Sequence, residues 1–210
     1  MSDSDQPGWD RREFLRASAL LAAVAGLPLS ACSTDGLDPA EAPSRQQREM
    51  LSAVAQLVIP RTDTPGAGDV GTGDFVILAL AHGLEGSRAK VPGSAGADQL
   101  RHRRRDGSLD HLTWLEWQLN NRSGGNWQGK EAAARSEALA MLDAEAFAEG
   151  VRDHPWRTIK GLILTGYYTS EVGGSQELRF ELVPGRFDPD LPVTPETRAW
   201  SSDWTAVDFG

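Results

Sequence analysis

Cysteine is almost absent from this sequence, which has only Cys32 among its 210 residues. A single cysteine excludes an intramolecular disulfide, a thiolate zinc site, an iron–sulfur cluster and covalent haem attachment. The histidines show no metal-ligand spacing either, and each is expected to be a helix cap or a surface residue. They are His82, His102, His111 and His154. The sequence therefore predicts no metal and no cofactor in this chain.

Positive charge is also scarce, because 21 lysines and arginines face 30 aspartates and glutamates and leave a net charge of −9. Proteins that bind nucleic acid need a basic surface, so no nucleic-acid partner is predicted. The exception is the basic cluster Arg101–Arg105, between Asp98 and Asp106. This cluster could dock an acidic partner or lipid head groups, or it could be a solvated loop.

Long apolar runs are missing apart from Ala17–Leu29. This run is shorter than the roughly 20 residues that a spanning helix needs, and it contains a glycine and a proline. Before it stand Arg11 and Arg12, followed closely by Phe14 and Leu15. This order is typical of a twin-arginine export signal, a route that accepts folded cargo. Residues 1–31 are therefore predicted to direct the protein to the periplasmic side of a membrane.

Small residues precede Cys32 at the end of the apolar run, as in a bacterial lipobox. In that interpretation Cys32 becomes the first mature residue and carries acyl chains that hold the protein at a membrane. The alternative is a plain signal peptide beside which Cys32 has no role. Residues 32–43 are rich in small and polar residues and are expected to form a flexible tether.

The rest of the chain, residues 44–210, has the length of one domain and is predicted to be mainly α-helical. Apolar spacing and capping residues indicate about five helices. Their expected ranges are Ser44–Ile59 with a capping box of Ser44 and Gln47, Gly73–His82, Ser108–Leu119 capped by Ser108, Lys130–Phe147 and Trp156–Tyr167. The stretch from Glu85 to Asp106 is expected to be a polar loop. Expected core residues include Phe75, Leu78, Ala81, Leu109, Leu112, Leu115, Leu119, Leu139, Met141 and Leu142.

The carboxy-terminal part loses the helical period. Leu178, Phe180 and Leu182 alternate with charged residues, which predicts a short strand with one buried face. From about residue 184 the chain has prolines and two tryptophans, Trp200 and Trp204, and is expected to be an extended arm. Two further tryptophans, at positions 114 and 117, should share one helix face, which could belong to the core or to a contact surface.

Two patterns could indicate chemistry, and both have simpler interpretations. The stretch Gly66–Gly71 matches the G-x-G-x-x-G of dinucleotide-binding folds, but prolines and polar residues precede it instead of a buried strand. A glycine-rich loop is the favoured interpretation. Asp143, Glu145 and Glu149 are expected to form a solvated helix face, and no base stands beside a nucleophile. The sequence thus predicts no catalytic residue.

Two stretches carry a family resemblance. Leu57–Ala67 is a helix end followed by a Pro-Arg-Thr-Asp-Thr-Pro-Gly turn, and it resembles the opening of the gluconate 2-dehydrogenase subunit 3 family. Lys160–Leu162, Gly166–Gly173 and Val183–Phe187 resemble the carboxy-terminal signature of the same family. Together with the leader, the resemblance covers most of the chain, except the region 85–126.

The resemblance implies a non-catalytic small subunit of a membrane-associated FAD-dependent dehydrogenase for sugars, sugar acids or polyols. FAD and the active site would be in a large partner subunit, and electrons would leave through a haem subunit or another acceptor. The small subunit would carry the export signal for both chains. This explains a folded-protein signal on a chain without a cofactor.

Residues of the two stretches and the two tryptophans of the arm are nominated for assembly with the partner. Arg61 could reach a carboxylate or a helix carboxyl end, and Asp63 could accept backbone N–H bonds in the turn. The full set is Arg61, Asp63, Pro65, Gly66, Tyr167, Tyr168, Ser170, Glu171, Trp200 and Trp204. One rival hypothesis is a free-standing envelope lipoprotein that binds a ligand or acts as a scaffold. Another is an enzyme that uses the Gly66–Gly71 loop.

Overall fold

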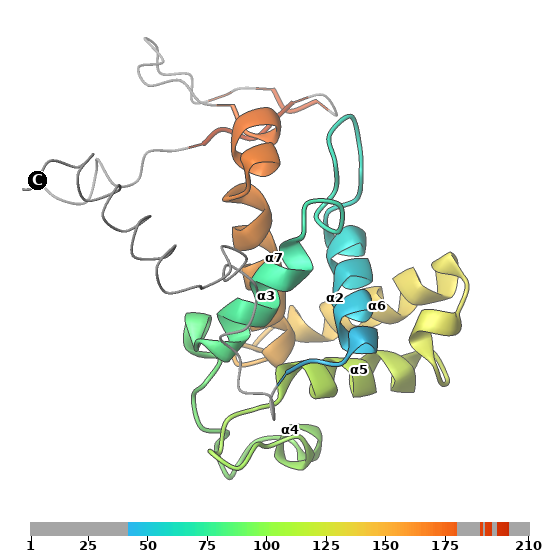
Figure 1. The fold of residues 1–210 in the computed structure, drawn as a ribbon, viewed down its shortest axis with the longest axis vertical. Coiled ribbons are helices and arrows are strands. Elements are labelled where there is room, and N and C mark those ends of the chain that lie inside the picture. The colour runs from blue at the N-terminus through green and yellow to red at the C-terminus, as the bar shows by residue number, and fades with distance from the viewer. Residues whose placement is uncertain (1–41, 180–189, 191, 195–196, 202–210) are drawn as a thin grey trace, which may run out of the picture. The chain divides into compact units, whose positions relative to one another are not determined.

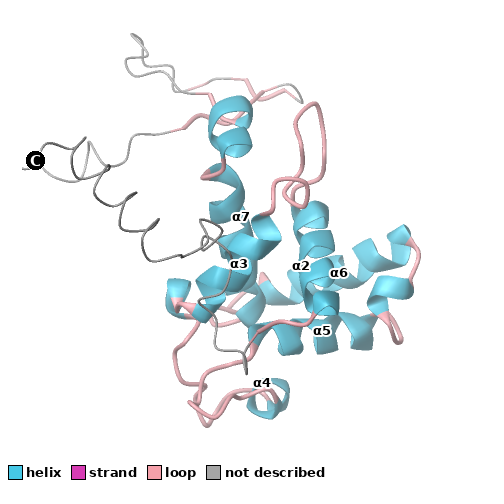
Figure 2. Cartoon of the chain, in the orientation of Figure 1, coloured by secondary structure: helices cyan, strands magenta, loops and turns pink. Residues whose placement is uncertain are grey.

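A computed structural model describes residues 42–179, 190, 192–194 and 197–201 of the chain, and these are mainly helical (Figures 1 and 2). This confirms the predicted fold class. The elements are α2 (Arg45–Val58), α3 (Thr72–Ala81), η1 (Leu84–Gly86), α4 (Ala97–Arg101), α5 (His111–Arg122), η2 (Trp127–Gly129), α6 (Ala132–Ala146), α7 (Pro155–Tyr168) and η3 (Gly173–Glu177). Outside the described residues lie Arg11, Arg12, Phe14, Leu15, Cys32, most of the tether and Trp204.

Helix α2 begins at the predicted capping box. The Ser44 hydroxyl accepts from the Gln47 amide at 3.1 Å, and the Gln47 side-chain oxygen accepts from the Ser44 amide at 3.0 Å. Both bonds satisfy donors that a helix start leaves without partners. Farther along, Leu51 and Val54 are completely buried. The apolar spacing read from the sequence therefore places α2 in the core.

The core lies among α2, α3, α5, α6 and α7. Helix α3 packs on α7 and α2, and α5 packs on α6 and α2. In Figure 1, α2 and α7 run upright, and α5 crosses below them. The largest side chains that this packing buries completely are aromatic. They are Trp114, Trp127, Trp156 and Tyr167.

The buried face of α3 differs from the predicted one. Phe75, Leu78 and Ala81 are only half-buried, whereas the core face includes Val76, Ile77, Ala79 and Leu80. The helix is apolar on nearly every side, so its sequence does not specify which side faces inward. Contact with both α7 and α2 decides this. In α6, Leu139 and Leu142 are buried as predicted, but Met141 is 52% exposed.

Helix α5 begins later than predicted, at His111. Its cap is Asp110, whose side chain accepts from the Thr113 amide at 3.2 Å. The predicted cap, Ser108, instead donates its hydroxyl to Asp106 at 2.7 Å. Both serine and aspartate are common helix caps, and the fold of the preceding segment places Asp110 at the cap position. The predicted inward leucines are all buried, namely Leu109, Leu112, Leu115 and Leu119.

We call the residues between α3 and α5 the 84–110 segment, which includes the stretch 85–106 that was expected to be a loop. They contain η1 and the short helix α4, which the sequence did not indicate. Isolated antiparallel bridges join Lys90 to Ser108 and Arg103 to Leu109. The segment is therefore folded back on itself beside α5.

The predicted strand is not formed by residues 177–179, the part of it that the structure describes. Residues 173–177 form a π-helical turn, and Arg179 makes one isolated parallel bridge to Trp200. Phe180 and Leu182 lie outside the described residues. Among the helices of the described ranges, none has the length and apolar character needed to cross a membrane.

Candidate functional site

The turn between α2 and α3, residues 59–71, is held close to α2 by glycines. A Cβ added at Gly66 would lie 2.7 Å from both the Arg61 nitrogen and the Ile59 oxygen, and one added at Gly68 would lie 2.7 Å from the Ser52 oxygen. Such distances do not allow a side chain. The glycines thus serve backbone packing, and the turn follows a helix instead of the strand that a dinucleotide site requires.

Asp69 organises the polar groups of this turn. Its carboxylate accepts from the Gly66 amide at 2.9 Å and from Gln56 at 3.2 Å, and it pairs with Arg61 at 2.8 Å. The hydrogen bond from Arg61, followed by the Gly66 bond, lowers the pKa of Asp69 below its usual value. Arg61 therefore reaches a carboxylate as predicted. The backbone-acceptor role predicted for Asp63 belongs to Asp69, and Asp63 is exposed.

The two motif stretches meet in space, although about a hundred positions separate them in sequence. The Tyr167 hydroxyl donates to the Pro65 carbonyl at 3.0 Å, and the Thr64 hydroxyl donates to the Glu177 carboxylate at 2.6 Å. Tyr167 is buried, with 1% of its surface exposed. Pro65, Gly66 and Tyr167 thus belong to one structure. We call this structure, residues 60–69 together with residues 167–177, the motif surface.

The end of α7 forms the second half of the motif surface. Ser170 donates its hydroxyl to the Tyr167 carbonyl at 2.6 Å and accepts from the Gly173 amide at 3.1 Å. Its polar groups are therefore used within the chain. Tyr168 is 36% exposed. Burial, and then the nearby Glu177, raise the pKa of Tyr168 above its usual value. Tyr168 and the exposed Glu171 are the nominated residues here that a partner could contact.

Trp200 lies beside the motif surface through its bridge to Arg179. The Arg179 amide donates to the Ala199 carbonyl at 2.9 Å, and the Arg179 guanidinium lies 5.8 Å from the Trp200 ring centre. Trp200 remains 48% exposed. It therefore presents an aromatic face next to η3, where a partner could cover it.

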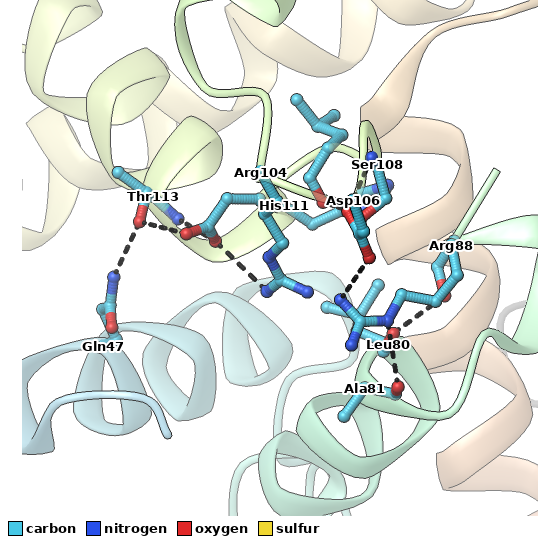
Figure 3. Close-up of polar contacts among 12 residues, drawn as sticks. Gln47, Leu80, Ala81, Arg88, Arg104, Asp106, Ser108, His111 and Thr113 are labelled. Carbon is cyan, nitrogen blue, oxygen red and sulfur yellow. Dashed lines mark hydrogen bonds and ion pairs between the residues drawn. The ribbon is translucent and has the colours of Figure 1, made fainter. Parts of the chain in front are cut away.

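Side chains join the 84–110 segment to the end of α3, and the sequence did not predict these contacts (Figure 3). Ser87 donates its hydroxyl to the Leu80 carbonyl at 3.0 Å, and Arg88 donates to the Ala81 carbonyl at 3.2 Å. Arg88 also pairs with Asp106 at 3.4 Å. Helix ends leave carbonyls without partners, so these bonds cap α3.

The basic cluster 101–105 is divided among separate contacts. Arg101 lies over the Trp117 ring at 5.7 Å, and the His102 ring contacts the same tryptophan at 5.7 Å. Arg104 pairs with Asp110 at 3.5 Å and has 17% of its side chain exposed. These arginines stabilise the segment, so the cluster does not form one continuous basic patch.

Asp98 connects α4 to the core. Its carboxylate accepts from the Trp114 indole at 2.8 Å and from the Gln118 amide at 2.7 Å. Trp114 is completely buried, whereas Trp117 is half-buried against the 84–110 segment. The two tryptophans therefore do not share one environment, which answers the question that their spacing left open.

Asp143 departs from the predicted solvated face of α6. It is half-buried and accepts from the Trp156 indole and from the Lys160 ammonium, each at 2.7 Å. Burial acts to raise the pKa of Asp143, but the bonds from Lys160 and Trp156 outweigh it and lower the pKa. Glu145 pairs with Arg122. These bonds join α6 to its neighbours.

The histidines have different environments. His154 caps α7 by accepting from the Trp156 amide at 3.3 Å, as predicted for a cap. His111 is buried, contrary to prediction, with 7% exposed. Burial lowers the pKa of His111 to about 4. No group of three or more potential metal ligands occurs within the ranges that the structure describes.

The described residues thus define a small helical protein whose motif stretches form one surface of turns and helix ends. Comparison with known families matches residues 45–185 to gluconate 2-dehydrogenase subunit 3. The chain belongs to this family. The matched range includes both halves of the motif surface and the 84–110 segment. Neither the curated proteins nor the solved structures yielded a match.

Proposed function

We propose that this protein is the non-catalytic small subunit and export escort of an FAD-dependent dehydrogenase that acts on sugars, sugar acids or polyols. The large partner subunit would hold FAD, and a haem subunit could carry electrons onward. The twin-arginine leader would bring the folded, cofactor-loaded partner across the membrane. Cys32 would anchor the complex at the periplasmic side.

The main support is that the family match contains two distant motifs, and these meet in the motif surface. The internal bonds of this surface fix its backbone and leave Tyr168 and Glu171 accessible, and Trp200 is exposed beside it. Aromatic side chains held by a rigid frame are typical anchors of protein interfaces. The arrangement is therefore suited to assembly.

Co-purification with the large subunit of the same organism tests the subunit role. Tyr168→Ala combined with Trp200→Ala should release the flavoprotein during affinity purification, because Tyr168 is exposed on the motif surface and Trp200 is exposed beside it. Met141→Ala is the matched control, since Met141 is also exposed but lies on α6. Equal recovery of the flavoprotein with all variants would contradict this interface.

Export requires a separate test. Replacing Arg11 and Arg12 with lysines should keep both subunits in the cytoplasm, because one leader would serve both. The measurement is cell fractionation with detection of each chain. A flavoprotein that still reached the periplasm would refute the escort role and leave the subunit role intact.

Cys32→Ala tests the anchor. It should release the mature protein from membranes in cells that lack the partner. Membrane association that persisted in those cells would refute acylation at Cys32.

A further inference from the structure

A pocket of about 260 Å³ lies where the 84–110 segment meets the beginning of α7. Its walls come from the residues after η1, from α4, from the start of α5 and from the loop between α6 and α7. Among the lining residues are Lys90, Gln99, His111, Arg152, His154 and Arg157. This volume is just below the range of drug-sized ligand sites, so it suits a small molecule.

Three cationic side chains from three different parts of the chain line this pocket. Lys90 comes from the 84–110 segment, Arg152 from the loop before α7, and Arg157 from the first turns of α7. Asp153 is the only carboxylate in the lining. A local excess of positive charge contrasts with the acidic chain as a whole. It favours an anionic ligand.

Two of these cations are available to a ligand. Lys90 and Arg152 are exposed, and within the described part of the chain neither makes an ion pair. Arg157 is held in place, because it donates to the Ala146 carbonyl at 2.8 Å and lies 4.3 Å from the Phe147 ring centre. One fixed and two adjustable cations therefore surround the pocket.

The beginning of α7 adds to this positive field. Its first amides are satisfied without a carboxylate, because Pro155 has no N–H and the Trp156 amide donates to Nδ1 of His154. The cap is therefore a neutral ring, although the Glu145 carboxylate lies 4.0 Å from its Nε2. Since Nδ1 of His154 accepts, the proton of the neutral ring is on Nε2, on the side of Glu145.

The inner wall contains a hydrogen-bond acceptor. His111 is more than nine-tenths buried, and its Nδ1 lies 3.2 Å from the Leu109 carbonyl, to which it must donate. A buried neutral ring that donates through Nδ1 keeps a lone pair on Nε2. Among the described residues, none occupies this nitrogen. It can accept an O–H from a ligand in the pocket that His111 lines.

We propose that this pocket binds a small anion that carries a hydroxyl group beside its carboxylate or phosphate. Lys90 and Arg152 would hold the anionic oxygens, Arg157 would add positive charge at the wall, and His111 would accept a hydrogen bond from the hydroxyl. Gln99 and Thr158, which also line the pocket, can bond further oxygens. We infer this class of ligand because the pocket combines cationic hydrogen-bond donors, which suit an anionic group, with one neutral acceptor, which suits a hydroxyl.

The test is isothermal titration of the purified mature protein with four probes. D-gluconate carries a carboxylate with hydroxyls, glycerol 3-phosphate carries a phosphate with hydroxyls, acetate lacks the hydroxyl, and glucose lacks the charge. At least one of the first two should bind, and acetate and glucose should bind about tenfold more weakly or not at all. Tighter binding of gluconate would identify a carboxylate as the preferred anionic group, and tighter binding of glycerol 3-phosphate would identify a phosphate.

Variants localise the binding. Lys90→Ala with Arg152→Ala should reduce affinity by about tenfold or more, and the fold should survive because both side chains are exposed. The control is Arg103→Ala with Arg105→Ala, which removes two exposed charges outside the pocket. Circular dichroism verifies folding. The proposal is overturned if no probe binds at tens of millimolar, if acetate binds as tightly as gluconate and glycerol 3-phosphate, or if both double variants lose affinity equally.

Discussion

The α2–α3 turn and the 84–110 segment are both irregular connections, but they are held in opposite ways. In the turn, backbone lies directly on backbone, and Gly66 leaves no space for a methyl group. In the segment, side chains such as Ser87, Arg88 and Asp98 reach across to helix ends and to buried donors. The α2–α3 turn therefore depends on positions without a side chain, whereas the 84–110 segment depends on the polar ends of side chains.

This difference determines how each region should respond to mutation. A steric conflict between backbone atoms cannot be relieved by rotating a side chain, so one added atom can disturb the whole turn. Polar bonds contribute about 1 kcal/mol each, so the segment should lose stability in steps. The following predictions test this contrast in order of decreasing effect.

Gly66→Ala should have the largest effect, a loss of about 3 kcal/mol in the free energy of unfolding. The added Cβ would lie 2.7 Å from two backbone atoms. Gly93→Ala is the control, because no heavy atom lies within 4 Å of a Cβ there. Urea denaturation measures both. Equal stability of the two variants would show that the backbone of the turn can move to make room for the added methyl group.

Asp98→Ala should cost about 2 kcal/mol, because it leaves two buried donors, on Trp114 and Gln118, without their acceptor. Asp63→Ala provides the comparison, since this aspartate is exposed in the turn. The difference in stability between the two variants is measured from their denaturant midpoints, provided that the denaturant dependence of the unfolding free energy is unchanged. A loss as large as that of Gly66→Ala would abolish the contrast between the regions.

Tyr167→Phe should cost about 1 kcal/mol by removing the hydroxyl bond to the Pro65 carbonyl. Tyr168→Phe loses an exposed hydroxyl one position later and should change the unfolding free energy little. Thermal unfolding of the pair is the measurement. If Tyr168→Phe were the more harmful, the bond between the two motifs would not hold them together.

Arg61→Ala should have the smallest effect on stability, since the pair with Asp69 is exposed. The main effect of this substitution should be on the ionisation of Asp69. The pKa of Asp69 should rise toward its usual value, because its largest stabilising contact is with Arg61. NMR titration of the carboxyl group measures this, with Arg45→Ala as the control. An unchanged Asp69 pKa would mean that the bonds from the Gly66 amide and Gln56 set it without Arg61.

Local patterns predicted several elements correctly. The capping box at Ser44 and the proline at the start of α7 fix helix ends by interactions within one turn. Such interactions involve neighbours in sequence and can be recognised there. The same holds for the leucine spacing of α5.

The errors concern residues whose partners are far away in sequence. Asp143, expected in solvent, meets Trp156 and Lys160 of another helix. His111, expected to be a helix cap or a surface residue, is buried and lines a pocket together with Arg152 and Arg157. No local signal indicates which long-range neighbour a polar residue will have.

The sequence by itself determined the helical class, most helix positions and the family resemblance, because these depend on periodicity, caps and contiguous motifs. Only the tertiary structure decided that Tyr167 bonds Pro65 and that Lys90, His111 and Arg152 line one pocket. Both results bring together residues distant in the chain. Their positions follow from how α7 packs against the other helices, and this packing is a property of the assembled core.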